Sequence, residues 1–358
     1  MSLKIFLTGG GTMGSVMPLL ALVPRLKENF PEIEIFWIGT KKGPEKRVIK
    51  NYQLNFKGIL GGKWRRYFSW RNFLDLFLIL LGFFQSIFII LKYRPHLIIS
   101  AGGFIGVPLI WAGWILRKKI IIHQQDLKPG LANKLTSPFA QKITVVFEES
   151  SEKFPFQKTI WLGNFIREEI LEGSKERARK IFHLKENFPT LLILGGGTGA
   201  LSLNQLVWQI LPELLKFSQI IHVTGRGKNF FQEKFPTYHP YEFLLNDLRD
   251  AYAVADLVIS RAGLSTLSEL SILAKPTILI PLPGSHQEKN ASYFEKKKAV
   301  IVLRQKDLKG REFLEEIKKI LLNPQKLDQL KRNIKGLIPF ANNKMIKLIK
   351  EVVQKSIS

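Results

Sequence analysis

Residues 259–290 read I-S-R-A-G-L-S-T-L-S-E-L-S-I-L-A-K-P-T-I-L-I-P-L-P-G-S-H-Q-E-K-N, and this stretch decides the fold. An apolar, mostly β-branched run at 257–259 leads to Gly263, after which a Ser/Thr cluster opens a segment with helical apolar periodicity. Lys275-Pro276 ends that segment before a second apolar run at 277–282, because proline cannot continue a helix. The order is therefore strand, turn, helix, strand.

The turn before this helix is suited to binding a phosphate. The first N–H groups of a helix have no partner within it, so Ser265 and Thr266 mark a natural seat for a phosphate oxygen. Glu269 lies one turn further along, where a carboxylate can accept hydrogen bonds from paired sugar hydroxyls. The alternative for this stretch alone is an ordinary helix cap followed by a solvated glutamate.

The composition is that of a folded protein with an anionic partner. A chain of 358 residues exceeds one average core and favours two domains. Its 54 Lys and Arg against 29 Asp and Glu give a formal net charge of +25, which indicates nucleic acid, an acidic membrane or a phosphorylated substrate. The absence of cysteine excludes disulfides and Cys-based metal chemistry. The N-terminus enters a strand-like segment directly, so we expect no signal peptide.

The first half alternates strands and helices, which predicts a doubly wound parallel sheet. We predict its strands at residues 4–8, 32–38, 97–100, 119–126 and 142–147. A glycine-rich turn at 9–15 follows the first strand, and Gly102-Gly103 follow the third. Ligands of open α/β sheets lie at the carboxyl ends of strands, so we expect these glycines and residues 123–126 to face one cleft.

A basic segment and an apolar segment interrupt this pattern. Residues 41–71 carry ten Lys or Arg against a single acid, and residues 73–91 are almost entirely apolar. The apolar segment is long enough to span a bilayer, but it lies between two predicted strands of one sheet. We therefore predict a crossover helix with one side on the sheet and another meeting lipid. The alternative is a helix wholly buried in the protein.

The second half restarts the same plan. We predict strands at 190–194, 220–224, 242–245, 257–260, 277–282 and 300–303, and helices near 203–215 and 344–355. A second glycine-rich turn, at 195–200, lies about 185 positions after the first and suggests two similar domains facing each other. We expect a first domain at 1–163 and a second at 164–340. The helix in 341–358 should pack back toward the first domain.

Several motifs in a fixed order resemble the MurG family. They are the first glycine turn with Pro18, Y-R-P at Tyr93, A-G-G at Ala101, H-x-Q at His123, G-L-A-N-K at Gly130, G-N-F-I-R ending at Arg167, the second glycine turn, A-Y-A-x-A-D at Ala251, R-A-G-L-S-T-L-S-E at Arg261 and H-Q-x-x-N-A at His286. A set of co-ordered motifs is far more specific than any single one. The resemblance runs nearly from end to end.

The resemblance implies a GT-B fold, in which two Rossmann-like doubly wound parallel-sheet domains face a cleft. It implies an inverting transferase that moves GlcNAc from UDP-GlcNAc to lipid I in peptidoglycan synthesis. The implied donor contacts are Arg167 and Leu245 near the uracil, Gly197, Thr198, Leu264, Ser265 and Thr266 near the diphosphate, Glu269 at the ribose hydroxyls and Gln287 at the GlcNAc hydroxyls. We expect no cofactor and no metal, because helix N-termini and arginine can stabilise the departing UDP.

The first domain would bind lipid I. The implied acceptor residues are Thr12, Met13, Gly14, Ser15, Gly102 and Gly103. The family's first turn usually ends in histidine where this chain has Ser15, and its usual Glu in the strand-end motif is Gln124. Neither Ser15 nor Gln124 can act as a base near neutral pH. We therefore name Asp126 as the candidate base and His123 as the nearest alternative, although a histidine there is often structural.

Other functions remain open from the sequence. An α/β protein that binds nucleic acid would explain the charge and the aromatic-basic segment 63–71, but no RNA-binding motif occurs and acidic lipid explains the charge equally well. We therefore expect no nucleic-acid partner and a peripheral location on an anionic membrane surface, at the cytoplasmic face of the plasma membrane. A GT-B enzyme with another lipid acceptor, or a nucleotide-sugar binding protein without activity, is also compatible with the sequence.

Overall fold

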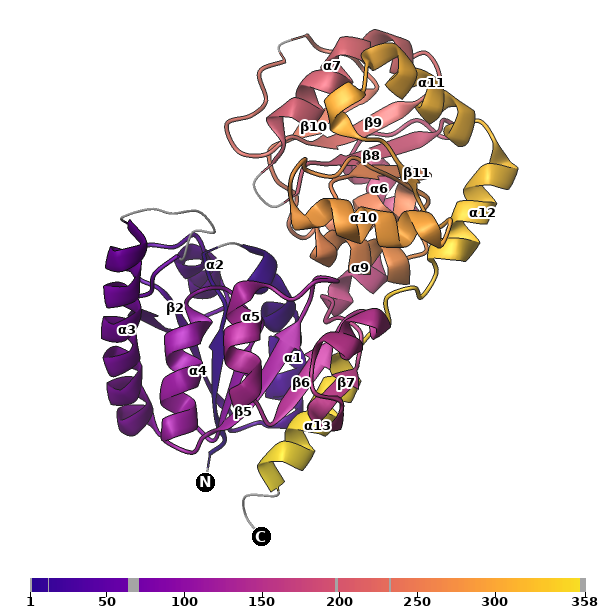
Figure 1. The fold of residues 1–358 in the computed structure, drawn as a ribbon. Coiled ribbons are helices and arrows are strands. Elements are labelled where there is room, and N and C mark those ends of the chain that lie inside the picture. The colour runs from indigo at the N-terminus through magenta and orange to yellow at the C-terminus, as the bar shows by residue number, and fades with distance from the viewer. Residues whose placement is uncertain (1, 12, 64–70, 197–198, 232, 355–358) are drawn as a thin grey trace. The chain divides into compact units, whose positions relative to one another are not determined.

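The computed structural model describes residues 2–11, 13–63, 71–196, 199–231 and 233–354. The chain forms two compact units: an N-terminal unit of Met1–Arg167 with Pro339–Ser358, and a C-terminal unit of Glu168–Ile338 (Figure 1). The chain therefore leaves the N-terminal unit once and returns to it once. The predicted site residues Thr12, Gly197 and Thr198 and the aromatic-basic residues 64–70 lie outside the described residues.

The N-terminal unit is built on a seven-stranded parallel sheet of order β3-β2-β1-β4-β5-β6-β7. The strands are β1 Lys4–Thr8, β2 Glu34–Thr40, β3 Asn55–Ile59, β4 Leu97–Ser100, β5 Lys119–Gln124, β6 Lys142–Val145 and β7 Thr159–Trp161. Side chains alternate between the two faces, so Ile5 and Leu7 enter one core while Phe6 enters the other. Both faces are therefore covered, which is why the strands read as continuous apolar runs.

Helices cover this sheet on both faces. They are α1 Met17–Asn29, α2 Glu45–Asn51, α3 Arg71–Tyr93, α4 Gly106–Ile115, α5 Leu131–Thr136 and α13 Asn342–Gln354. Although α13 comes from the end of the chain, it packs against α1 in the N-terminal unit (Figure 1). Met345 and Ile349 of α13 are fully buried in the same core as Ile5 and Leu7.

Helix α3 is long and apolar enough by length and composition to cross a membrane. It joins β3 to β4 of one sheet and packs along α4, so it is a crossover helix. Its outward side chains include Phe73, Phe77, Phe84 and Phe88, which are 60–67% exposed. The alternative of a wholly buried helix is therefore wrong.

The C-terminal unit contains a six-stranded parallel sheet of order β10-β9-β8-β11-β12-β13. The strands are β8 Thr190–Leu194, β9 Gln219–Val223, β10 Tyr238–Tyr241, β11 Leu257–Ser260, β12 Thr277–Leu279 and β13 Ile301–Val302. The helices are α6 Lys175–Ile181, α7 Leu201–Leu214, α8 Leu248–Val254, α9 Leu264–Ile272, α10 His286–Lys296, α11 Gly310–Leu321 and α12 Pro324–Ile334. Strand order reverses next to the central strand in each sheet, between β1 and β4 and between β8 and β11.

Three strands lie where none was predicted. The strand predicted at 242–245 is wrong, because β10 occupies Tyr238–Tyr241 and Leu245 is 58% exposed. Its sequence Y-H-P-Y contains a proline, which an edge strand tolerates and a central strand does not. The prediction also missed β3 and β7, because N-F-K-G-I lacks a continuous apolar run and T-I-W is only three residues long.

Candidate active site

The points where strand order reverses are the natural ligand sites of such sheets. In the C-terminal unit, β8 ends at the second glycine turn and its neighbour β11 ends at Ser260, just before α9. In the N-terminal unit, β1 ends at the first glycine turn and its neighbour β4 ends before Gly102-Gly103. The motifs that sequence analysis assigned to donor and acceptor therefore lie at the reversal points of their sheets.

The start of α9 presents backbone donors. Gly263 precedes the helix in an extended conformation, and the first helical hydrogen bond runs from Leu267 N to Gly263 O. The N–H groups of Leu264, Ser265 and Thr266 thus precede the helical ladder, and no described side chain caps them. This end of the helix is suited to an anion.

Glu269 is held inside the C-terminal unit. It is 8% exposed, and its Oε2 accepts a hydrogen bond of 2.9 Å from the hydroxyl of Tyr252 on α8. A buried carboxylate needs such donors, because desolvation is costly. The alternative of a solvated glutamate is therefore wrong, while its assignment to a ribose stays a prediction.

Arg261 is a site residue to which sequence analysis gave no role. It follows β11 directly and is 5% exposed. Its Nη1 donates to the carbonyl oxygens of Ile280 and Pro281 at 2.9 and 3.4 Å, and its Nη2 donates to the Ser202 hydroxyl at 2.9 Å. Burial lowers the pKa of Arg261, yet arginine stays charged at neutral pH.

No carboxylate pairs with Arg261 among the described residues. Ser202 lies in the first turn of α7, the helix that the second glycine turn opens. A guanidinium that lacks a carboxylate partner therefore lies between the starts of α7 and α9. In the described part of the chain, no group of three or more His, Cys, Asp or Glu could hold a metal ion. The signal for Arg261 was its place immediately after a buried strand.

The other predicted donor residues are more scattered. Gln287 is half-buried near the start of α10, where its Oε1 accepts a hydrogen bond of 3.1 Å from Leu282 N. Leu245 is exposed in the loop after β10. Arg167 is the last residue of the N-terminal unit before the chain crosses to the other unit.

The acceptor glycines of the N-terminal unit pack directly against one another. Gly103 has a φ of +85°, and a Cβ there would lie 2.7 Å from Gly10 O and 3.3 Å from Ser15 Oγ. Ser15 is buried at the end of the short 3₁₀ helix Met13–Ser15, while Gly14 is exposed. The turns after β1 and β4 are thus in contact, and only glycine fits the second of them.

Gln124 at the end of β5 has a structural hydrogen-bond role. It is 2% exposed. Its Oε1 accepts a hydrogen bond of 2.6 Å from Nδ2 of Asn133, and its Nε2 donates a hydrogen bond to the backbone oxygen of Asp126. The Oδ1 of Asn133 is buried without a partner among the described residues, and a Cβ on Gly102 would lie 3.2 Å from it. Asn133 therefore leaves a buried acceptor beside the glycine pair, and Asp126 is half-buried at the same strand end.

His123 is fully buried. Its Nδ1 lies 2.9 Å from Thr144 Oγ1, its Nε2 lies 3.2 Å from Asn164 Oδ1, and its ring stacks on Phe165 with centroids 4.3 Å apart. Burial lowers the pKa of His123 to about 4, although the bond to Asn164 opposes this. The imidazole is therefore neutral at neutral pH and engaged at both nitrogens, which is typical of a structural histidine.

Comparison with known proteins identifies the family. The model of the glycosyltransferase family 28 N-terminal domain matches residues 5–145, and that of the C-terminal domain matches residues 190–352. The chain belongs to glycosyltransferase family 28. The predicted resemblance to the MurG family and the predicted GT-B fold are confirmed.

Relatives of this family 28 chain match it over nearly their whole length. A Clostridium kluyveri protein named UDP-N-acetylglucosamine--N-acetylmuramyl-(pentapeptide) pyrophosphoryl-undecaprenol N-acetylglucosamine transferase is 39% identical over 355 residues, covering 97% of this chain and 99% of that one. A protein of the same name from Clostridium perfringens strain SM101 is 40% identical over 346 residues, with coverages of 94% and 96%.

Solved structures share the fold of this family 28 chain. MurG of Acinetobacter baumannii superposes with a TM-score of 0.75 at 21% identity, covering 98% of this chain and 99% of that one. A UDP-GlcNAc 2-epimerase from Neisseria meningitidis, solved with UDP-GlcNAc bound, has a TM-score of 0.70 at 13% identity and covers 98% and 100%. At these identities the similarity concerns the fold alone.

Proposed function

We propose that this chain transfers GlcNAc from UDP-GlcNAc to lipid I, the diphosphate-linked polyprenyl MurNAc-pentapeptide, and so forms lipid II. The observation that carries the proposal is the near full-length identity of 39% to a relative named for this reaction. The site supports it, since a helix N-terminus, a buried carboxylate and a guanidinium that has no carboxylate partner among the described residues all follow β11 at the reversal point of the C-terminal sheet.

The C-terminal unit would bind the donor. Glu269 would accept hydrogen bonds from the ribose hydroxyls, and Gln287 would contact the GlcNAc hydroxyls. The start of α9 and the charge of Arg261 would stabilise the diphosphate as the bond from C1 of GlcNAc to UDP breaks. These groups act without a metal, because positive charge is already fixed where negative charge develops. Arg167 and Leu245 stay our candidates for the uracil.

The N-terminal unit would bind the acceptor. The glycine turn after β1 and the pair Gly102-Gly103 allow the backbone to approach a pyrophosphate closely. The acceptor hydroxyl would attack C1 of GlcNAc from the face opposite UDP, which inverts the anomeric centre. Asp126 would take the hydroxyl proton, since Ser15 and Gln124 cannot act as bases near neutral pH.

Helix α3 would place the enzyme on the membrane. Phe73, Phe77, Phe84 and Phe88 present an apolar surface outward, while Gln85 accepts a hydrogen bond of 2.8 Å from Leu60 N on the inner side. A helix tied to its own unit in this way can lie in the interface without spanning the bilayer. We propose a peripheral location at the cytoplasmic face, where the net charge of +25 favours anionic lipid.

The test is transfer of radiolabelled GlcNAc from UDP-GlcNAc to a short-chain lipid I analogue. We expect a labelled product with the inverted anomeric configuration. UDP-GlcNAc binding without transfer to lipid I, but with transfer to another polyprenyl diphosphate sugar, would reassign the acceptor. Tight, salt-dependent RNA binding with no UDP-GlcNAc binding would contradict the proposal.

A further inference from the structure

We infer that Tyr252 is a positioning residue for the donor, whose hydroxyl holds the Glu269 carboxylate in the orientation that receives the ribose hydroxyls. This inference rests on the proposed function, in which Glu269 binds the ribose. Tyr252 belongs to the A-Y-A-x-A-D motif, and the sequence alone assigns it no role.

The geometry places Tyr252 directly behind Glu269. Tyr252 lies on α8 and is 1% exposed. Its hydroxyl donates a hydrogen bond of 2.9 Å to Oε2 of Glu269 on α9. A carboxylate offers about four lone-pair positions, so a bond from the interior can fix its rotation and is compatible with further bonds to sugar hydroxyls. Without an inner donor, a carboxylate that is 8% exposed would meet the cost of desolvation with less compensation.

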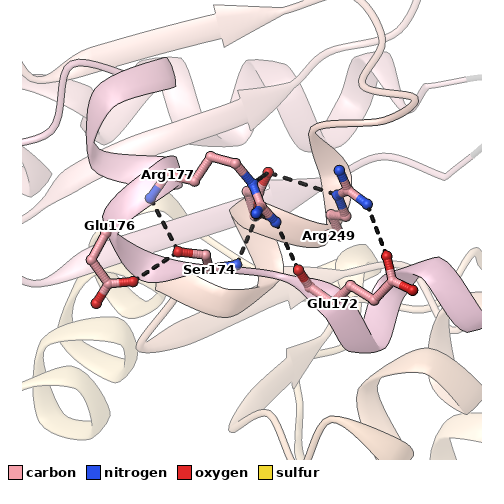
Figure 2. Close-up of polar contacts among 6 residues, drawn as sticks. Glu172, Ser174, Glu176, Arg177 and Arg249 are labelled. Carbon is pink, nitrogen blue, oxygen red and sulfur yellow. Dashed lines mark hydrogen bonds and ion pairs between the residues drawn. The ribbon is translucent and has the colours of Figure 1, made fainter.

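Helix α8 is itself anchored, so Tyr252 is held on a fixed support. Figure 2 shows a cluster in which Arg177 on α6 and Arg249 on α8 make polar contacts with their neighbours. Asp250 is 1% exposed and accepts from Arg177 Nη2 at 2.7 Å, Arg177 Nε at 2.9 Å and Ser174 N at 2.8 Å. Arg249 adds an ion pair of 3.2 Å to Glu172.

The spacing of Asp250 and Tyr252 explains how one short helix serves both contacts. Residues two apart on an α-helix project about 200° apart, because a turn takes 3.6 residues. Asp250 therefore faces α6 while Tyr252 faces α9. The bidentate Arg177–Asp250 pair fixes the helix, and the helix fixes the hydroxyl that orients Glu269.

The hydroxyl is the part of Tyr252 that packing does not explain. A phenylalanine would fill the same apolar space, and a buried hydroxyl is costly unless it has a partner. The partner here is the one carboxylate that the proposed function places at the ribose. The choice of tyrosine over phenylalanine is thus accounted for by Glu269.

The experiment is the Tyr252→Phe variant, measured by calorimetry with UDP and with 2′-deoxy-UDP. We expect the wild type to bind UDP more tightly than the deoxy compound, because Glu269 uses the ribose hydroxyls. In Tyr252→Phe, the Kd for UDP should rise by about tenfold and the preference for UDP should shrink toward one. The Kd for 2′-deoxy-UDP should change much less.

A double-mutant cycle tests whether Tyr252 acts through Glu269. In a Glu269→Ala background, Tyr252→Phe should have no further effect on UDP affinity, because residues that share one interaction are not additive. Additive losses in the double variant would overturn the inference.

Tyr238→Phe is the matched control. It also removes a buried hydroxyl of the C-terminal unit, one that lies 2.9 Å from both His222 Nδ1 and Trp208 Nε1. Its melting temperature should fall while the preference for UDP stays at the wild-type value. If Tyr252→Phe behaves like this control, Tyr252 is only structural. If the wild type fails to bind UDP at all, the proposed function fails instead.

Discussion

The guanidinium of Arg261 and the hydroxyl of Ser202 are joined by a hydrogen bond of 2.9 Å that links the end of β11 to the first turn of α7. Arg261 belongs to the motif after β11, and Ser202 follows the second glycine turn after β8. The two strands are neighbours, so this bond lies at the carboxyl ends of the strands between which the strand order reverses. A fixed positive charge therefore lies between two helix starts.

Replacing Arg261 by methionine should weaken diphosphate binding specifically. The variant removes a buried charge and its donors, and hydrogen bonds to charged groups contribute about 1.5–3 kcal/mol each. We expect the Kd for UDP to rise at least about tenfold, with a smaller change for uridine, which lacks the diphosphate. Calorimetry with both ligands measures the difference.

Ser202→Ala is the control for this prediction. It removes the hydroxyl of an exposed serine, which accepts from Arg261 Nη2 and donates to Gln305 Oε1 at 3.3 Å, but it leaves the guanidinium in place. UDP affinity should therefore stay within about twofold of the wild type. Equal losses for UDP and uridine in Arg261→Met would show that Arg261 supports the fold of the site and not the diphosphate.

Replacing Phe77, Phe84 and Phe88 by serine should release the protein from vesicles that contain anionic phospholipid. Each large apolar side chain withdrawn from lipid forfeits about 1.5–3 kcal/mol, and these three are exposed, so the fold should persist. Vesicle sedimentation measures binding, and the melting temperature reports the fold.

A different exposed phenylalanine serves as the control for the α3 variant. Phe156 is 91% exposed outside α3, so Phe156→Ser should leave vesicle binding unchanged. Full retention of the triple variant on vesicles would exclude the outer side of α3 from membrane contact. Resistance of the wild type to alkaline carbonate extraction would instead favour a spanning helix.

The buried imidazole of His123 should make the free energy of unfolding decrease in mild acid. Burial lowers its pKa from 6.5 to about 4, so the unfolded state binds the proton more readily between these values. The stabilisation is complete above pH 6.5 and is lost as the pH falls through 4, with a maximum of about 3 kcal/mol. Urea unfolding of the wild type and of His123→Gln at several pH values measures the contribution of His123 to the free energy of unfolding.

The contribution of His123 is the difference in the free energy of unfolding between the wild type and His123→Gln, because carboxylates titrate in this pH range in both proteins. We expect the wild type to lose more stability than His123→Gln between pH 6.5 and pH 4. Parallel pH profiles would mean that His123 is not buried as a neutral group. Turnover of His123→Gln at neutral pH separates the structural role from a role as base.

The sequence predicts the elements whose local pattern agrees with their burial. Strand β1 and strand β11 match their predicted bounds, because continuous apolar runs bounded by glycine or polar residues have few alternatives. Strand β10 was misplaced because Tyr238–Tyr241 pairs only along one edge, where polar residues and proline are allowed. Local pattern carries little information about an edge strand.

Some features of the candidate site could likewise be predicted from the local sequence, and others could not. Motifs such as the start of α9 could be named from the sequence, because a helix start after a glycine is a local feature. The partners of Glu269 and Arg261 could not, since Tyr252 and Ser202 are distant in sequence and meet only through the order of strands in the sheet. The interior position of His123 likewise depends on Asn164, which approaches it from 41 residues away.

Asp126→Asn should slow transfer while leaving donor binding nearly intact. Asp126 follows β5 at the edge where the glycine turns meet and is half-buried. Gln124, which occupies the position of the usual carboxylate, has both ends of its side chain engaged by Asn133 and the backbone, so it is fixed as part of the scaffold. Asp126 is then the nearest carboxylate in sequence that could take the acceptor proton.

A positioned general base contributes about 10²–10⁴-fold, so kcat should fall by at least the lower figure in Asp126→Asn. The Kd for UDP should change little, because Asp126 is not among the proposed donor contacts. Asn133→Ala is the companion variant: it removes the hydrogen bond of 2.6 Å from Asn133 Nδ2 to Gln124 Oε1, so it should lower the melting temperature while reducing kcat less than Asp126→Asn does. Near-normal turnover in Asp126→Asn would remove this residue from the mechanism. A pH profile of kcat/KM that loses its acidic limb in Asp126→Asn, but keeps it in Asn133→Ala, would identify Asp126 as the group that takes the proton.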